Sequence, residues 1–444
     1  MTFALRQNSP KIFMPPLAAE SRLIMDKFYE KSAKLKIILA VSVTVLLFII
    51  GLAFFARPTI SENEKRELTK FPKFTFEAFL SGEYTSQISL WFSDTYPLRE
   101  PMIEANGMIQ ELHGIRDEQV IGGGEADDIP AGPADIVFNP TDDGKGEGFE
   151  GMYLNGDTAY QLYFFNKQNS DSYVALINKF AASVEGKAQV YDMIVPLHYQ
   201  IALSKETVDK YGASDCKEAI DYMYGNLSDS IISVDTLPNL ISHNDEYLYF
   251  RTDHHWTARG AYYAYLAFCE EKGIEPTDLE SYQRLEFKGF LGTFYANAKQ
   301  PASMKQNPDY VEAFVPMGTN EEVVYDSNGN KIAEYAIVYT KADKYDAGKK
   351  YTAFIGGDQP LIEIHNPNVT DGSSVVVVKE SYGNAFIPFL VDSYEHVYVI
   401  DYRQWSGDLA DFVVSKGIDD VLFLNVVSNT STSARLKELS KIIK

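Results

Sequence analysis

VVVVKESYGN, at residues 375–384, is the part of this sequence that says most about its architecture. Four consecutive valines are typical of a strand that is covered on both faces, as strands in parallel sheets are. The polar string after them stands where such a strand would turn into a helix, and it places Ser381 at that turn. Because sites in open parallel sheets form at the carboxyl ends of strands, Ser381 lies where a functional side chain is expected.

Strand-like and helix-like segments alternate on both sides of this stretch. Short apolar runs occur at residues 188–197, 230–237, 396–401 and 420–426, and helical apolar spacing occurs at residues 170–184, 217–227, 258–272 and 434–443. The alternation predicts an α/β fold in which helices flank a parallel sheet. Arg403 and Asn425 come at or just after predicted strand ends, so the edge that holds Ser381 can hold them as well.

Residues 280–360 interrupt the alternation. Asn328-Gly329 stands between apolar runs at residues 323–325 and 333–339, and Asn-Gly between such runs is a strong hairpin signal. We therefore expect a β-rich antiparallel insertion at about residues 280–360.

An uncharged run of 20 residues, Ile37–Ala56, lies near the N-terminus. As a helix it would be about 30 Å long, which is the thickness of the hydrocarbon core of a membrane. A buried helix and a cleaved signal peptide are the alternatives, although the run is long for a signal peptide and lacks an A-x-A cleavage site. Residues 1–36 carry seven basic side chains against three acidic ones, so the positive-inside rule places them in the cytoplasm and the chain after residue 57 outside.

These patterns divide the chain into four parts. Residues 1–36 are expected to form a cytoplasmic tail, residues 37–56 one transmembrane helix, and residues 57–150 a juxtamembrane entry segment with a flexible loop. The loop is placed at residues 121–150 because Gly, Asp, Pro and Glu dominate there. Residues 151–444 would be the extracytoplasmic α/β domain, so the protein is expected at the cell membrane as a single-pass protein.

Charge and cysteine content exclude some classes of protein. The net charge is −22, and a strongly acidic surface repels nucleic acid, which we do not expect as a partner. Cys216 and Cys269 are the only cysteines, so a zinc finger is excluded by count. Both lie in apolar, helical-looking stretches, which favours two buried thiols, while an oxidising compartment would permit a disulfide between them.

A second polar string, Asp253-His254-His255-Trp256, supplies a carboxylate and imidazoles just before a predicted helix. In a tight turn Asp253 can bond Nδ1 of His255, which leaves Nε2 free as a base. Trp256 would then form a wall of the site. The alternatives are a polar loop capped by Asp253 and a metal site, for which three or four ligands must converge. His198, His243 and His365 offer more imidazoles, but none has helical i, i+4 spacing; no metal and no cofactor is expected.

Ser381 also has two readings. It can be an ordinary helix N-cap, or it can be a nucleophile that His255 activates. The surrounding residues do not form G-x-S-x-G, so an α/β-hydrolase elbow is not supported. As a nucleophile, Ser381 would use backbone N–H groups near Tyr382 and Gly383 as an oxyanion hole, with help from Asn425, while Arg403 would contact substrate. Asp358, in a Gly/Asp/Pro stretch, looks like a turn residue.

The two strings together resemble the DHHW proteins of Gram-positive bacteria, which are named after the first of them. The resemblance extends to residues 61–72 and 82–99, to Phe290-Leu291-Gly292 and to residues 379–384. That family is similar in turn to the SGNH-hydrolase-like domains of bacterial alginate O-acetyltransferases. The resemblance therefore implies an SGNH-type domain in which Asp253 and His255 match the D-x-H pair and Ser381 the nucleophile. It also implies a multipass membrane acyltransferase as partner. Glu380 departs from the pattern, because Asp is more usual before the serine.

The combined expectation is a membrane-anchored serine-dependent acyltransferase that O-acetylates a cell-surface polysaccharide. Two alternatives stay open. The same triad with water as acceptor gives an esterase or deacetylase, and a member without catalysis would bind a glycan or a membrane partner.

Overall fold

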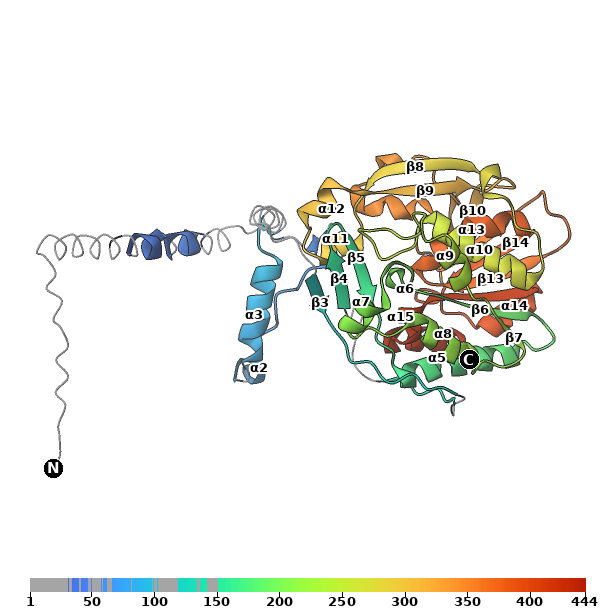
Figure 1. Cartoon of the computed structure of the whole chain (residues 1–444), viewed down its shortest axis with the longest axis horizontal. Helices are drawn as coiled ribbons and strands as arrows, with labels where there is room; N and C mark the ends of the chain where they lie inside the picture. Colours follow the sequence, from blue (N-terminus) through green and yellow to red (C-terminus); the bar gives the residue numbers. More distant parts are fainter. Residues whose placement is uncertain are drawn as a thin grey trace, which may run out of the picture. The chain divides into compact units, whose positions relative to one another are not determined.

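The computed structural model describes residues 151–444 without a gap and shorter stretches before them, namely residues 31, 34–39, 41–46, 49, 57, 59–61, 66–80, 82–97, 99, 102, 119–132, 134 and 136–141. Contacts along the chain divide it into two units, Met1–Met102 and Ile103–Lys444 (Figure 1).

Beside the helical residues near its N-terminus, the described part of the first unit contains two short strands and two helices. They are β1 Ile60–Ser61, β2 Arg66–Glu67, α2 Phe76–Leu80 and α3 Glu83–Asp94, and β1 pairs antiparallel with β2. Asp94 accepts hydrogen bonds from the backbone and the hydroxyl of Thr69, each at 2.8 Å, which ties the end of α3 to the strand region.

The predicted membrane span falls only in part on described residues. Residues 37–39, 41–46 and 49 are helical, and the rest of Ile37–Ala56 lies outside the described residues, as does most of residues 1–36. Among the residues that the structure describes, no helix is both long enough and apolar enough to cross a bilayer.

The second unit is built on a mixed sheet of eight strands in the order β11-β10-β12-β14-β13-β15-β6-β7. The strands are β6 Gln189–Val195, β7 Ile231–Ser233, β10 Glu321–Tyr325, β11 Lys331–Ala336, β12 Leu361–His365, β13 Ser374–Lys379, β14 His396–Asp401 and β15 Asp420–Val426. Neighbours from β14 to β7 are parallel, and β12, β10 and β11 continue the sheet antiparallel. The predicted α/β fold with a largely parallel sheet is confirmed.

Helices cover both faces of this sheet. They are α5 Lys167–Ser183, α6 His198–Ala202, α7 Lys205–Lys210, α8 Cys216–Tyr224, α9 Leu237–Ser242, α10 Ala258–Lys272, α13 Ile387–Leu390, α14 Leu409–Lys416, α15 Val427–Thr430 and α16 Ser433–Ile442. Phe180 of α5 packs on Phe423 of β15, and Phe268 of α10 packs on Tyr191 of β6. Because Tyr191 pairs with Leu422 and not with Phe423, the two helices lie on opposite faces.

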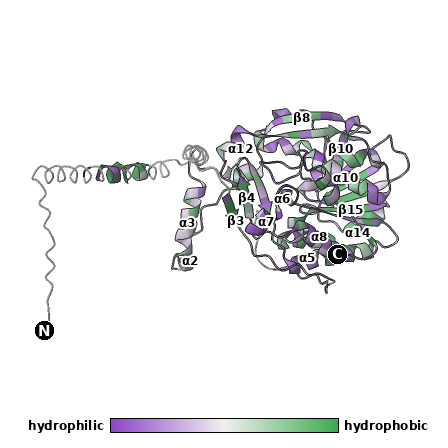
Figure 2. Cartoon of the chain, in the orientation of Figure 1, coloured by the Kyte–Doolittle hydropathy of each residue, from purple (hydrophilic) through white to green (hydrophobic). Residues whose placement is uncertain are grey.

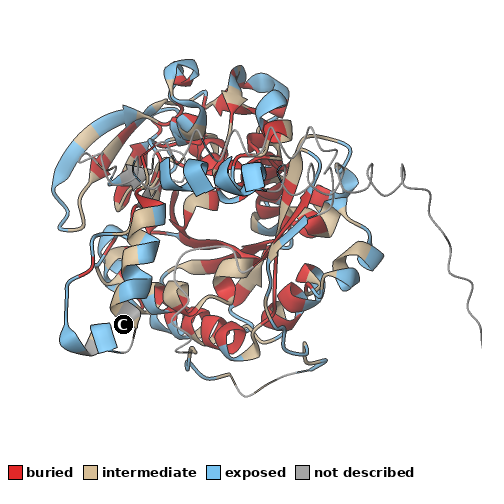
Figure 3. Cartoon of the chain, turned by 90° about the vertical axis from the view of Figure 1, so that its left-hand side faces the viewer, coloured by how far each residue is buried: buried red, intermediate tan, exposed pale blue. Residues whose placement is uncertain are grey.

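The core follows from the sequence pattern. All six residues of β13 and all seven of β15 are buried, as continuous apolar runs between two helical layers should be. Figure 2 shows hydrophobic residues on the central strands, and Figure 3 shows the buried residues along the same strands and on the helix sides that face them. Helix α10 begins and ends as expected, since the Thr257 hydroxyl accepts from the Gly260 N–H and Gly273 has φ of 73°.

Two smaller sheets and several short helical segments complete the described part of the unit. β3 Gln119–Gly122, β4 Gly151–Asn155 and β5 Thr158–Leu162 form a three-stranded sheet, and β8 Gln283–Phe290 pairs with β9 Asp309–Val315. The helices α11 Thr293–Asn297 and α12 Ala302–Gln306 lie between β8 and β9. The 3₁₀ turn η1 Leu279–Ser281 precedes β8, and the turns η2 Ala342–Lys344, η3 Ala347–Ala353, η4 Ser381–Ala385 and η5 Val391–Ser393 follow β9.

The region at residues 280–360 is β-rich, with one difference from the prediction. The hairpin at Asn328-Gly329 is present, because β10 and β11 pair around it. These strands do not form a separate insertion, however, since β10 pairs with β12 and so joins the main sheet. Only β8 and β9 stand apart as a ribbon of their own.

Part of the stretch predicted as a flexible loop forms a strand. Residues 119–122 form β3, which pairs with β4, and Asp127 N–H donates to the carbonyl of Phe165 at 2.8 Å. The stretch assigned to a flexible loop is therefore in part a strand of the second unit, which begins at Ile103; residues 142–150 lie outside the described residues.

Both cysteines are free and buried, as the prediction of two buried thiols has it. The Cys216 thiol donates to the Tyr199 hydroxyl at 3.1 Å, and burial raises the pKa of both thiols to about 12.

Candidate active site

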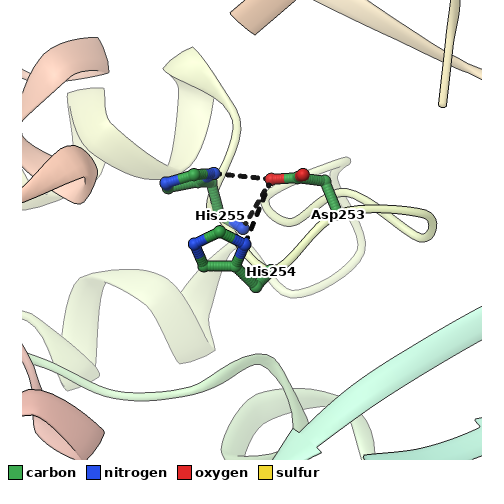
Figure 4. Close-up of side chains that lie close together, drawn as sticks. All are labelled: Asp253, His254 and His255. Carbon is green, nitrogen blue, oxygen red and sulfur yellow. Dashed lines mark hydrogen bonds and ion pairs between the residues drawn. The ribbon is translucent and has the colours of Figure 1, made fainter. Parts of the chain in front are cut away.

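The loop before α10 holds Asp253 and His255 in a fixed relation. Tyr249 and Trp256 form an isolated antiparallel bridge that closes this loop. Within it, Asp253 Oδ1 lies 2.5 Å from Nδ1 of His255 and also accepts the His255 backbone N–H at 3.1 Å (Figure 4). Because a buried carboxylate accepts and does not donate, this contact assigns the proton to Nδ1 and leaves the Nε2 lone pair free.

Ser381 completes the arrangement from the other end of the chain. One residue, Glu380, separates it from the end of β13, and it is the first residue of η4. Its Oγ lies 2.8 Å from Nε2 of His255. A second acceptor, Glu380 Oε2, lies farther from the same hydroxyl, at 3.3 Å. Asp253 and His255 are buried and Ser381 is half-buried. The structure thus brings Asp253, His255 and Ser381 together in the order that a serine nucleophile requires.

The second oxygen of Asp253 is held by the start of α11. Asp253 Oδ2 accepts from the Thr293 backbone N–H at 2.8 Å and from the Thr293 hydroxyl at 3.1 Å. Gly292 allows this close approach, because a Cβ there would lie 2.1 Å from Oδ2. The string Phe290-Leu291-Gly292 therefore belongs to the site, and Thr293 orients the carboxylate that orients His255.

His254 takes a different position from its neighbour. Its Nδ1 lies 2.6 Å from the Thr293 hydroxyl and 3.7 Å from Asp253 Oδ1, and its carbonyl accepts the Tyr382 hydroxyl. Asp253, His254 and His255 are close enough to be considered as metal ligands. A metal ion on Asp253 Oδ1 would have to displace the His255 Nδ1 proton, however, so this donor set suits a proton relay better than a cation.

Aromatic rings enclose the imidazole of His255. Tyr351 stacks on it with ring centroids 4.1 Å apart and an angle of 13° between the planes, and donates its hydroxyl to the Ser381 carbonyl at 3.1 Å. Trp256, predicted as a wall, is fully buried and donates its indole N–H to the Tyr382 carbonyl at 2.8 Å. Both side chains therefore hold the turn that contains Ser381 against the loop that contains His255.

Glu380 caps the turn that presents Ser381. Its Oε2 accepts the Tyr382 N–H at 3.0 Å, and its Oε1 accepts the Val426 N–H at 3.0 Å. The Gly383 N–H donates to the Glu380 carbonyl. The two N–H groups expected to form an oxyanion hole are thus engaged by Glu380. In the part of the chain that the structure describes, the Ser381 N–H has no acceptor, so it is the donor still open to a ligand.

Arg403 lies in an ion network beside the turn. Its guanidinium pairs with Asp401 at 2.5 Å and with Asp358 at 2.8 Å, and the buried ammonium of Lys379 bonds Asn384 at 2.7 Å. Burial raises the pKa of Asp358, but Lys379 and Arg403 outweigh it and hold that pKa well below its usual range. Arg403 therefore orients acidic groups, and Asp358 is more than a turn residue.

Asn425 is placed inside the core. Its side-chain oxygen accepts the Tyr402 hydroxyl at 2.9 Å, and its amide donates to the Tyr173 hydroxyl at 3.3 Å. It is 2 % exposed. These bonds give it a structural part at the end of β15, because both its oxygen and its amide are engaged by tyrosine hydroxyls.

Three residues of the site were missed by sequence reasoning. Thr293 and Tyr351 contact the carboxylate and the imidazole, yet each is a common residue type in an unremarkable context. Glu380 was noted only as a departure from a family pattern. The one available signal was Phe290-Leu291-Gly292, which borders Thr293.

The fold and the site define an α/β protein that carries a Ser–His–Asp relay at the carboxyl edge of its parallel strands. Residues 64–143 and 132–400 match the family model for DHHW proteins, which is more than half of the chain. The chain belongs to the DHHW family. A search of the curated proteins found no significant match.

A solved structure agrees with this assignment, and others are similar in fold or more distantly. A DHHW family protein from Eubacterium siraeum is 30% identical in sequence and superposes with a TM-score of 0.58. The match covers 65% of this chain and 94% of the Eubacterium siraeum chain. Bacillus cereus PatB1, solved with a sulfonyl adduct, is 18% identical over 64% of this chain and 97% of its own, with a TM-score of 0.54. The O-acetyltransferase domain of Pseudomonas putida AlgJ, 12% identical over 63% of this chain and 96% of its own, reaches a TM-score of 0.36, too slight a likeness to carry an argument.

Proposed function

We propose that the protein transfers an acyl group, specifically an acetyl group, through Ser381 to a hydroxyl of a cell-surface polysaccharide. The observation that carries the proposal is the continuous relay from Asp253 through His255 to Ser381, with heavy-atom distances of 2.5 Å and 2.8 Å. Both distances are within the reach that nucleophilic catalysis by serine requires.

The first half-reaction forms an acyl-enzyme. Ser381 Oγ attacks the carbonyl carbon of the donor while its proton passes to Nε2 of His255, and Asp253 stabilises the imidazolium that results. The negative charge on the carbonyl oxygen is stabilised by the open N–H of Ser381. His255 then gives its proton to the leaving group, and the acetyl group remains on Ser381 as an ester.

The second half-reaction reverses these roles. A sugar hydroxyl attacks the acetyl-serine, His255 takes the proton of that hydroxyl, and Ser381 recovers it on release. With water in place of the sugar, the same steps give hydrolysis, so the acceptor decides between a transferase and an esterase. The choice of acetyl group and polysaccharide is supported by the resemblance of the D-x-H pair and the following serine to alginate O-acetyltransferases.

The proposal includes a membrane location. The uncharged run Ile37–Ala56 would anchor the chain with residues 1–36 in the cytoplasm and the α/β unit outside. There a multipass membrane acyltransferase would supply the acyl group, and the polysaccharide would be the acceptor.

Acyl-enzyme formation tests the proposal most directly. The full chain in detergent micelles would be incubated with p-nitrophenyl acetate or a sulfonyl fluoride and mapped by mass spectrometry. We expect an adduct on Ser381 that is lost in Ser381→Ala and in His255→Ala. Ser415→Ala, at an exposed serine on α14, is the matched control and should label normally.

The acceptor is tested with the labelled enzyme. Addition of oligosaccharides should discharge the acetyl group onto sugar faster than water alone does. Discharge to water only would assign an esterase. If the folded protein gave no adduct and no ester turnover, the relay would not act alone, and the proposed activity would be wrong.

A further inference from the structure

Two imidazoles and a carboxylate meet at the edge of the sheet opposite to Ser381. His365 is the last residue of β12 and His396 the first of β14, and the two are direct partners in the antiparallel pair. Ser381 follows the carboxyl end of β13, whose amino end, Ser374, pairs with His396. Five further residues of β13 and one of the turn therefore separate this cluster from the nucleophile.

The three ligand atoms are spaced for one small cation. Glu395 Oε1 lies 3.9 Å from His365 Nε2 and 3.6 Å from His396 Nε2, and all three atoms lie within 4.8 Å of one another. Tetrahedral zinc with bonds of about 2.0–2.1 Å sets its ligand atoms about 3.4 Å apart. Small side-chain rotations would close the present spacing to that value.

Hydrogen bonds fix the carboxylate and the backbone of Glu395. Glu395 Oε2 accepts the Gly372 N–H at 2.7 Å, which leaves Oε1 directed at the imidazoles. The backbone of Glu395 is fixed as well, since its carbonyl accepts the Asn366 N–H at 2.9 Å and its N–H donates to Ser373 Oγ at 3.2 Å. Hydrogen bonds of this kind orient a ligand before the ion arrives.

The imidazoles are also ordered and within reach of solvent. Their rings stack with centroids 5.0 Å apart, and the side chains of His365, His396 and Glu395 are 57%, 40% and 21% exposed. An ion can therefore enter without any opening of the core.

A hollow of about 570 Å³ adjoins the two histidines and is lined mainly by acidic and aromatic side chains. Its wall includes Glu321, Glu334, Glu363 and Tyr398, of which Glu363 pairs with Lys416 and Glu334 with Lys331. These lysines offset part of the acidic charge of the wall, and the hollow leaves room for a water or another ligand in the remaining coordination position.

We propose that His365, Glu395 and His396 bind a divalent cation of borderline softness, zinc in the first place. Two neutral imidazoles and one carboxylate form a donor set that zinc uses in sites with an open fourth position. Bound zinc would clamp the end of β12 to the start of β14. The inference does not depend on the activity at Ser381.

Zinc binding by the full chain in detergent micelles, purified with a tag that contains no histidine, tests this site. Isothermal titration with ZnCl₂ would be compared for the wild type, for H365A with H396A, and for E395Q, which keeps the size of the side chain. We expect one site in the wild type and a loss of affinity of more than about 100-fold in the variants, because even outer-shell changes cost ~10–100-fold. His243→Ala, at a half-buried imidazole stacked on Tyr263, is the matched control and should bind normally.

Thermal unfolding gives a second readout. Zinc should raise the Tm of the wild type and of His243→Ala, because it binds only the folded chain, and should leave H365A with H396A unchanged. Equal binding by all of these variants, or binding lost in His255→Ala and kept in H365A with H396A, would overturn the proposal and place the ion elsewhere. No binding by the folded wild type would overturn it as well.

Discussion

His255 Nε2 lies 2.8 Å from Ser381 Oγ, although 126 positions separate the two residues in the chain. The contact joins the loop before α10 to the turn after β13, and Trp256 and Tyr351 fasten the same two segments. The base and the nucleophile are thus already in hydrogen-bonding contact without substrate, so we expect reactivity toward small activated esters in the absence of any partner.

Asp253→Asn should abolish most of the activity without unfolding the protein. An amide at this position no longer enforces a proton on Nδ1 of His255, and the tautomer with a free Nε2 is lost. In Ser-His-Asp enzymes this change lowers kcat by roughly 10⁴-fold, and we expect a loss of about 10³–10⁴-fold in turnover of p-nitrophenyl acetate.

Thr293→Val is the graded control for that experiment. It removes one of the two Thr293 hydrogen bonds to Asp253 Oδ2 and keeps the backbone one, so the loss should be about tenfold or less. If Asp253→Asn retained near wild-type turnover with an unchanged Tm, the carboxylate would have no part in catalysis.

Gly292→Ala should lower ester turnover, although Gly292 is not one of the three relay residues. The new methyl group would lie 2.1 Å from Asp253 Oδ2, so the loop has to move, and a displacement of about 1 Å at a catalytic group costs roughly 10²-fold in rate. We expect such a loss in ester turnover together with a lower Tm. Gly132→Ala, where a Cβ meets nothing within 4 Å, serves as the control; equal behaviour of the two variants would contradict the proposed role of this glycine.

Two variants of Tyr351 distinguish the effect of its stacking on His255 from the effect of its hydrogen bond to Ser381. Tyr351→Phe keeps the ring on His255 and removes the hydroxyl bond to the Ser381 carbonyl, so stability should fall by about 0.5–1.5 kcal/mol and kcat only a few-fold. Tyr351→Leu also removes the stacking ring and should lower kcat further. The pair is compared by urea unfolding and by kcat for the acetyl ester, and an equal kcat for both variants would exclude a role for stacking.

Glu322 makes stability depend on pH. Its carboxyl group is buried, both oxygens lack a hydrogen-bond partner among the described residues, and burial raises its pKa to about 8. The folded state therefore keeps a proton that the unfolded chain loses near its ordinary pKa of 4.5. The stability from this group is complete below that ordinary value and is lost as the pH rises toward 8, at about 1.4 kcal/mol for each pKa unit.

Glu322→Gln should remove this dependence. We expect the variant to match the wild type at pH 4 and to have the higher Tm at pH 8.5, measured by differential scanning fluorimetry over that range. Glu321→Gln, at the exposed neighbouring position, is the control and should follow the wild type at both pH values. Parallel curves for the wild type and Glu322→Gln would show that Glu322 is ionised in the folded protein.

The sequence predicted most of the sheet and the three residues of the relay. Runs such as 375–379 and 420–426 are continuous because both of their faces are buried, so local composition was sufficient to assign them. The pairing of β10 with β12 was missed, because a hairpin signal describes only its own two strands and not what lies beside them. The N–H groups of Tyr382 and Gly383 were assigned to an oxyanion hole for a related reason, since only the structure shows that Glu380 already engages both.

The place of β15 in the sheet determines when the serine turn can be fully supported during synthesis. β15 stands between β13 and β6, yet it follows the other seven strands of this sheet in the sequence. Until residues 420–426 emerge from the ribosome, β13 has no neighbour on that side, and Glu380 lacks the Val426 N–H that helps to hold the serine turn. A chain that contains Asp253, His255 and Ser381 but not yet residues 420–426 would therefore have the three relay residues without the strand and the backbone donor that support the serine turn.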